Sequence, residues 1–172
     1  MTELRRCVFL DRDGVINKEF GYQITRIEEF ELMDGLKDDL ERFKAAGFLL
    51  IIVTNQSGIA KGHYTEEFVY QCYNVIQKEV GGIMNDMYFA PGHDSVSKSL
   101  SRKPDSLMFE KAMAKWHIDP GQSFMIGDKD RDLVPAKKLG MNTILLSDDK
   151  SSNYADQQVQ ELSQAVALIV NG

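Results

Sequence analysis

Four short, continuous runs of apolar residues constrain the fold of this 172-residue chain more than any other feature. Polar residues do not alternate within them, which is typical of strands that are buried on both faces of a parallel sheet. A weaker fifth run is stopped by Pro91 and Gly92. The sequence therefore predicts strands at 7–10, 48–53, 124–126 and 143–146, with a further candidate at 87–90.

Segments with helical spacing separate these runs. Leu36, Leu40 and Phe43 recur at helical intervals, and Gly47 is a typical residue just after a helix end. Similar spacing predicts further helices at about 65–80, 105–117, 133–140 and 154–170. Strands that alternate with helices need crossover connections, so we expect an α/β fold with a doubly wound, Rossmann-like, mostly parallel sheet and helices on both faces.

Size and composition limit what the chain can be. A single domain accounts for residues 1–172, with its core at about 7–147. The net charge of -6 argues against a protein that binds nucleic acid by neutralising phosphates. No apolar run reaches the roughly 18 residues of a membrane span, and the first residues lack a signal-peptide core. Two cysteines are too few for a disulfide framework. Together these features lead us to expect a cytoplasmic monomer without a membrane partner.

Two aspartates follow the first apolar run. In doubly wound sheets ligands bind beyond the carboxyl ends of the strands, so these positions matter most. Asp11 and Asp13 would face the same way if the strand continued. Two close carboxylates are costly unless a cation or a shared proton separates them. The alternative is an ordinary turn, in which one aspartate caps the chain beside Gly14.

Polar residues follow the later runs as well. The segment 54–57 offers hydroxyl and amide donors that suit phosphate oxygens. The acidic segment 128–132 offers oxygen ligands for a hard cation such as Mg²⁺. Arg102 and Lys103 precede a predicted helix, where an anion meets positive charge and backbone N–H groups. Each pattern alone is also typical of a solvated turn, but their order along the chain indicates phosphate chemistry.

The order of these segments resembles the four motifs of the haloacid dehalogenase superfamily of phosphohydrolases. The sequence is most similar to the branch that contains D,D-heptose 1,7-bisphosphate phosphatases and histidinol-phosphate phosphatases. The matching segments span nearly the whole domain, 7–147, and leave no room for a large cap domain. They read DRDGVIN at 11–17, GY at 21–22, TNQSG at 54–58, RKP at 102–104 and GDKDRD at 127–132.

The resemblance implies a Mg²⁺-dependent phosphomonoester hydrolase that works through an aspartyl-phosphate. Asp11 would be the nucleophile, and Asp13 the general acid and then the general base. Thr54 and Lys103 would hold the phosphoryl oxygens. These roles supply what an anionic ester needs for hydrolysis, namely charge neutralisation, a positioned nucleophile and a proton for the leaving group.

The same resemblance implies the metal ligands and the substrate side. Magnesium is expected on Asp11, the backbone carbonyl of Asp13 and Asp128, while Asp132 would orient a water on the metal from outside the ligand set. The implied substrate-binding residues are Glu19, Phe20, Gly21, Tyr22, Asn55, Gln56, Ser57, Arg102 and Lys129. The two cations among them suit a second phosphate, so the expected partner is a small phosphorylated metabolite, above all a sugar bisphosphate.

One segment departs from the family pattern. In that branch a loop reading Cys-Pro-His and a later Cys-x-Cys typically bind a structural zinc. Here 90–92 reads Ala-Pro-Gly and 99–101 reads Ser-Leu-Ser, so all four zinc ligands are replaced. His93 alone cannot hold the ion, and we therefore expect no structural zinc and a metal-free loop.

The substrate has alternatives. The resemblance implies removal of the C7 phosphate of D-glycero-D-manno-heptose 1,7-bisphosphate, with histidinol phosphate or another small sugar phosphate as the alternative. A phosphorylated signalling receiver also carries acids, threonine and lysine at strand ends, but its phosphoacceptor follows its acidic pair on a later strand. A non-catalytic binding module is disfavoured because every residue that the chemistry requires is present, and a nucleotide switch because no GxxxxGK[ST] loop occurs.

Overall fold

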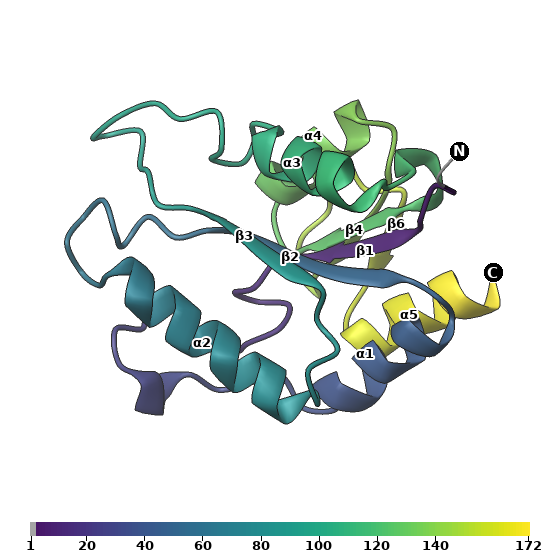
Figure 1. Ribbon diagram of the computed structural model, residues 1–172, viewed down its shortest axis with the longest axis horizontal. Coiled ribbons are helices and arrows are strands. Elements are labelled where there is room, and N and C mark those ends of the chain that lie inside the picture. Colours follow the sequence, from purple (N-terminus) through teal and green to yellow (C-terminus); the bar gives the residue numbers. More distant parts are fainter. Residues whose placement is uncertain (1–2) are drawn as a thin grey trace.

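Six parallel strands form one sheet at the centre of the protein (Figure 1), in a computed structural model that describes residues 3–172. Their order across the sheet is β3-β2-β1-β4-β5-β6. The four predicted strands and the weaker candidate are confirmed, and a sixth strand was not predicted. The strands are β1 (Cys7–Leu10), β2 (Leu49–Asn55), β3 (Asp86–Ala90), β4 (Phe124–Gly127), β5 (Asn142–Leu146) and β6 (Gln157–Val159).

Five α-helices cover the two faces of the sheet, as expected from the sequence. In Figure 1, α3 and α4 lie above the sheet, and α1, α2 and α5 lie below it. Two 3₁₀ helices, at Ile27–Glu29 and Pro120–Gln122, lie in the connections. The α-helices are α1 (Leu36–Ala45), α2 (Glu66–Glu79), α3 (Leu107–Trp116), α4 (Asp130–Lys138) and α5 (Leu162–Asn171).

The apolar runs are continuous because both faces of the sheet are covered. In β1, Val8 and Leu10 pack in the core shared with α1, α2 and α5. Cys7 and Phe9, which alternate with them, pack in the core shared with α3 and α4. All four side chains are fully buried. A strand in such a position needs apolar residues at every position rather than at every second one.

The predicted C-terminal helix at 154–170 was wrong in its first part. The helix begins at Leu162, and residues Gln157–Val159 form β6. This strand pairs in parallel with β5, so that Val159 lies opposite Leu146. Val159 and Leu162 are three residues apart, and a strand followed by a helix places both in the core just as one helix would. The spacing alone could not distinguish the two.

The topology brings distant segments together at one edge of the sheet. Strand β1 lies between β2 and β4 in the sheet, so its two neighbours lie on opposite sides of it. The carboxyl ends of these three strands are therefore adjacent, at the switch point where doubly wound sheets bind ligands. The long loops that follow β2 and β3 extend from this edge, on the left of Figure 1.

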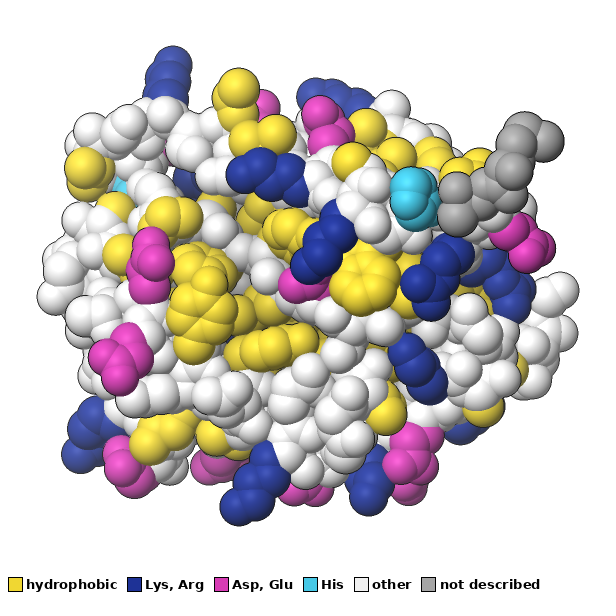
Figure 2. All heavy atoms as spheres, in the orientation of Figure 1, with side chains coloured by type: hydrophobic (Ala, Val, Ile, Leu, Met, Phe, Trp, Pro, Cys, Tyr) yellow, Lys and Arg dark blue, Asp and Glu magenta, His cyan; other side chains and the backbone are white. Residues whose placement is uncertain are grey.

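Charged side chains of both signs lie on the face of the protein that Figure 2 shows. On the face drawn in Figure 2, basic and acidic side chains are scattered around hydrophobic ones and form no continuous basic stripe. Within residues 3–172, no helix combines the length and the apolar character that a membrane span requires.

Candidate active site

Three carboxylates from two strand ends and one helix meet at the switch point. Asp11 follows β1, Asp128 follows β4, and Asp132 lies in the first turn of α4. Each offers a ligand atom, and these atoms all lie within 4.8 Å of one another. Asp11 and Asp128 meet because β1 pairs directly with β4. The structure thus brings together two of the predicted metal-binding aspartates, and it places Asp132 beside them.

Lys103 supplies positive charge to this carboxylate cluster. Its Nζ lies 2.9 Å from Asp11 Oδ1 and 2.6 Å from Asp132 Oδ1. The same ammonium donates to the backbone carbonyl of Val53 at 2.8 Å. The lysine is almost completely buried, so these contacts occur away from water and are strong. Lys103 is where the sequence interpretation placed it, next to the proposed nucleophile.

Asn55 holds the backbone of Lys103. Its Oδ1 accepts from the Lys103 N–H at 2.9 Å, and its Nδ2 donates to the Lys103 carbonyl at 3.0 Å. Asn55 was expected on the substrate side. It does line the cavity described below, but its amide is already used to fix the segment that carries the lysine.

Two glycines allow the aspartates to approach so closely. Gly14 has a φ of 86°, and a Cβ there would lie 2.7 Å from Asp128 Oδ2. A Cβ at Gly127 would lie 2.4 Å from the Cβ of Asp132. Both glycines belong to the recognised motifs, and their role is to leave room for the carboxylates.

The carboxylate cluster is short of positive charge. Burial first, and then the Asp132 carboxylate, raise the pKa of Asp11 to about 7 despite the opposing charge of Lys103. Burial also raises the pKa of Asp128. Asp128 Oδ1 is buried and accepts no hydrogen bond from the described residues. A cluster of buried carboxylates that includes such an unpartnered oxygen suits a hard divalent cation, so these residues fit Mg²⁺.

Asp13 does not share this environment. Strand β1 ends at Leu10, so Asp13 lies beyond the strand, and its hydrogen bonds differ from those of Asp11. Asp13 Oδ1 accepts from Arg12 Nη2 at 2.9 Å and from Asn17 Nδ2 at 3.1 Å. Burial opposes ionisation of Asp13, but the Arg12 guanidinium and these hydrogen bonds outweigh it, so its pKa lies below the ordinary value.

Gln56 connects Asp13 to Thr54. Its Nε2 donates to Asp13 Oδ2 at 3.0 Å and to Thr54 Oγ1 at 2.9 Å. Its Oε1 accepts from the hydroxyl of Tyr64 at 2.6 Å. Gln56 and Thr54 are both buried. Gln56 was expected to bind substrate, and in the structure its amide orients the proposed general acid.

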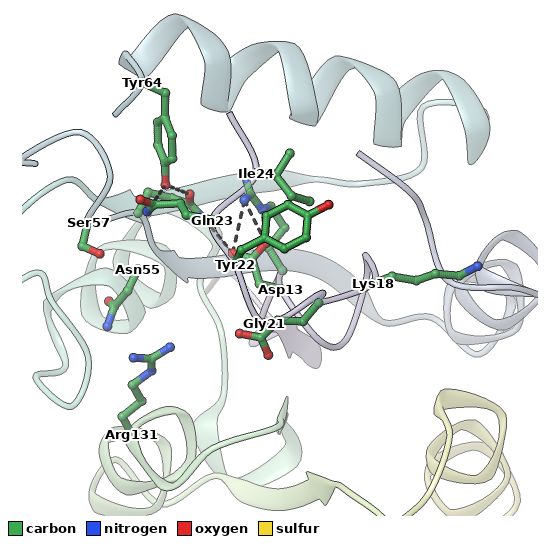
Figure 3. Close-up of a pocket in the computed structure, with 13 residues that line it drawn as sticks. Asp13, Lys18, Gly21, Tyr22, Gln23, Ile24, Asn55, Ser57, Tyr64 and Arg131 are labelled. Atoms are coloured by element: carbon green, nitrogen blue, oxygen red, sulfur yellow. Dashed lines mark hydrogen bonds and ion pairs between the residues drawn. The ribbon is translucent and has the colours of Figure 1, made fainter. Parts of the chain in front are cut away.

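A polar cavity of about 280 Å³ opens beside Asp13 (Figure 3). Six of the predicted substrate-side residues line it, namely Glu19, Gly21, Tyr22, Asn55, Gln56 and Ser57. The sequence interpretation missed Gln23, Tyr64 and Arg131, which also line it. Arg131 lies inside the acidic motif and could have been noticed there, whereas nothing in the sequence distinguishes Tyr64 from other tyrosines.

Three predicted substrate residues do not line this cavity. Phe20 stacks on Tyr22, with ring centroids 5.9 Å apart. Arg102 donates to the Gly92 carbonyl at 3.2 Å. Lys129 Nζ lies 3.0 Å from both carboxylate oxygens of Glu19. The two cations that were expected to bind a second phosphate are therefore engaged with protein groups.

The loop at 91–101, which was expected to be metal-free, contains several hydrogen bonds of its own. The hydroxyls of Ser99 and Ser101 are 2.7 Å apart, and the Ser101 N–H donates to Ser99 Oγ at 3.3 Å. Gly92 lies against Ser99, since a Cβ on the glycine would be 3.5 Å from the serine Cβ. His93 Nδ1 is bonded to Ser95 within the loop.

Several known phosphatases are similar to this chain. The HAD-hydrolase-like family model matches residues 100–171. A D-glycero-beta-D-manno-heptose-1,7-bisphosphate 7-phosphatase of Haemophilus ducreyi is 35% identical over 83% of this chain and 82% of that protein. A D-glycero-alpha-D-manno-heptose-1,7-bisphosphate 7-phosphatase of Burkholderia mallei is 34% identical over 86% of this chain and 82% of that protein. The chain belongs to this family of phosphatases.

A solved structure supports the fold independently. The D,D-heptose 1,7-bisphosphate phosphatase of B. bronchiseptica, solved with magnesium and phosphate, matches with a TM-score of 0.86 at 19% identity. The match covers 96% of this chain and 98% of that one, so this phosphatase has the haloacid dehalogenase-like fold with no large cap domain. The resemblance inferred from the motifs is confirmed.

Proposed function

We propose that this phosphatase removes the C7 phosphate of D-glycero-D-manno-heptose 1,7-bisphosphate. The substrates named for its relatives support this proposal. The observation that carries it is the contact of Lys103 with both Asp11 and Asp132 in a carboxylate cluster next to a polar cavity. A buried ammonium among three carboxylates suits a site where the negative charge of a phosphoryl group must be balanced.

Hydrolysis would proceed in two displacements at phosphorus. In the first, an Asp11 oxygen attacks phosphorus, the bond from phosphorus to the C7 oxygen breaks, and that oxygen takes a proton from Asp13. In the second, water attacks the aspartyl-phosphate and gives a proton to Asp13, and the bond from phosphorus to Asp11 breaks to release phosphate. Because Arg12 favours the ionised form of Asp13, we expect protonation when the negative charge of the substrate arrives beside it.

The other site residues would hold the groups that react. Lys103 and Thr54 would bind phosphoryl oxygens, and Gln56 would keep the Asp13 carboxyl pointed at the leaving oxygen. Asp11 and Asp128, with the Asp13 backbone carbonyl, would hold Mg²⁺, and Asp132 would orient this set. When bound, the cation supplies positive charge that offsets repulsion between the carboxylates and the phosphoryl group.

The test is a comparison of kcat/KM among phosphomonoesters at saturating Mg²⁺. The substrates are both anomers of the heptose 1,7-bisphosphate, histidinol phosphate and fructose 1,6-bisphosphate. We expect the highest value for one heptose anomer and loss of activity with EDTA. A highest value for histidinol phosphate would contradict the assignment, and release of no more than one equivalent of phosphate would indicate a receiver.

A further inference from the structure

One cation in the wall of the cavity has no side-chain partner among residues 3–172. Arg131 lines the same cavity as Asp13, and its side chain is exposed. Its guanidinium comes from α4 and points toward Asn55 (Figure 3). Among residues 3–172, no carboxylate lies within ion-pair distance of it and no side chain accepts a hydrogen bond from it.

The other cations near the cavity are already paired with protein groups. Lys129 is paired with Glu19 and Asp128. Lys18 points away from the other labelled residues in Figure 3 and lies 3.3 Å from Glu31. The Arg12 guanidinium is bonded to Asp13.

Arg102 and Lys103 are also bonded to protein groups. Arg102 donates to the loop carbonyl of Gly92, and Lys103 is buried against Asp11 and Asp132. An incoming anion could reach any of these cations only in competition with a protein group. Arg131 requires no such exchange.

The stability of α4 does not explain an arginine at this position. Arg131 is the second residue of the helix, and the positive end of the helix dipole disfavours a cation in the first turn. Its neighbours Asp130 and Asp132 have the charge that the helix start favours. Binding of a ligand, rather than stabilisation of the helix, would explain an arginine here.

We propose that Arg131 binds the second anionic group of the substrate, the phosphate that is not cleaved, and so determines specificity for a bisphosphate. This proposal rests on the proposed function. A phosphomonoester whose leaving oxygen lies by Asp13 would extend through the cavity toward Asn55 and Arg131. An arginine is suited to this task because its planar guanidinium can bind a phosphate through two parallel hydrogen bonds.

The experiment compares Arg131→Gln with wild type on two substrates that differ only in the second phosphate, heptose 1,7-bisphosphate and heptose 7-phosphate. We expect KM for the bisphosphate to rise about ten- to hundredfold, the range for a lost hydrogen bond to a charged group. KM for the monophosphate and both kcat values should stay near wild type. Arg131→Lys should recover part of the loss, and Lys138→Gln, at an exposed lysine of the same helix, is the matched control.

Two results would overturn the proposal: an unchanged KM for the bisphosphate, or an equal rise for both substrates. A fall in melting temperature would also contradict it, because we expect the neutral variant to be as stable as the wild type. If the wild type does not hydrolyse the heptose bisphosphate, the proposed function fails by itself. Calorimetric binding of fructose 1,6-bisphosphate and fructose 6-phosphate then tests Arg131 separately. Selective weakening of the bisphosphate supports the assignment, and any other pattern contradicts it.

Discussion

The carboxylate cluster and the rim of the cavity are built in different ways. The carboxylate cluster (Asp11, Asp128 and Asp132, with Lys103) is buried, and two of its aspartates directly follow neighbouring strands. The rim (Glu19, Gly21 and Tyr22) is exposed and lies on a loop. Strand pairing fixes the positions of the first group. The contacts of the rim residues depend on which side chains happen to lie near the loop. The effects of substitutions should therefore differ between the two regions in size and in kind.

The largest effect is expected from Asp11→Asn. An amide of nearly the same shape is a poor nucleophile, so kcat should fall on the order of 10⁴-fold or more. Circular dichroism and the melting temperature should stay close to wild type, because the substitution also removes one of the mutually repelling carboxylates. Retention of a tenth of the activity would remove Asp11 from the nucleophile role.

The next largest effect is expected from Asp128→Asn. This change replaces a carboxylate whose Oδ1 is buried and unpartnered among the described residues. Magnesium affinity should fall by more than about 100-fold, since even groups that only support metal ligands cost 10- to 100-fold. Calorimetric titration with Mg²⁺ measures this affinity. Asp130→Asn, at an exposed residue two positions along, is the control and should bind Mg²⁺ as the wild type does.

Asn55→Ala probes the connection between the two regions. It removes both hydrogen bonds that hold the Lys103 backbone. A small displacement of a catalytic group can cost about 100-fold, so we expect kcat to fall about 10- to 100-fold with a smaller change in KM. The control is Asn74→Ala, at an exposed residue of α2 that does not line the cavity, and it should leave kcat and KM near wild type. A rise in KM alone would instead assign Asn55 to substrate binding, as the sequence interpretation had it.

The smallest effect is expected at the rim, from Glu19→Gln. Glu19 lies beside Lys129, and removal of its negative charge should favour an anionic substrate. Exposed ion pairs contribute less than about 1 kcal/mol, so KM should fall by no more than about fivefold. Glu28→Gln, which does not line the cavity, is the control. A rise in KM would mean that Glu19 binds the substrate directly, and the contrast between carboxylate cluster and rim would then be weaker.

Much of the fold could be predicted from sequence because burial on both faces leaves a clear pattern. Every continuous apolar run became a strand, including the weaker one before Pro91. Strand β6 was missed because Gln157 and Gln158 face solvent and only Val159 reaches the core. A three-residue edge strand with one buried side chain has no periodicity that could distinguish it from the start of a helix.

The residues of the candidate site also differ in how far the sequence could predict their positions. The meeting of Asp11 with Asp128 follows from strand order, and the sequence indicated it. The partners of Gln56 and Lys129 could not be predicted, because each depends on a loop conformation that strand order does not determine. Arg131 was not predicted because its acidic neighbours dominate the motif. Only the three-dimensional structure shows that it has no side-chain partner in the described part of the chain.

The loop at 91–101 has a consequence for how the protein responds to oxidants. Serine hydroxyls stand where the related branch typically carries thiolates, so an oxidant finds no sulfur there that could form a sulfenic acid or release a metal. The two cysteines of the chain, Cys7 in β1 and Cys72 in α2, are buried, and burial raises the pKa of Cys72 to about 11. The phosphatase should therefore keep its loop structure in peroxide concentrations that would damage a relative whose loop depends on cysteine ligands.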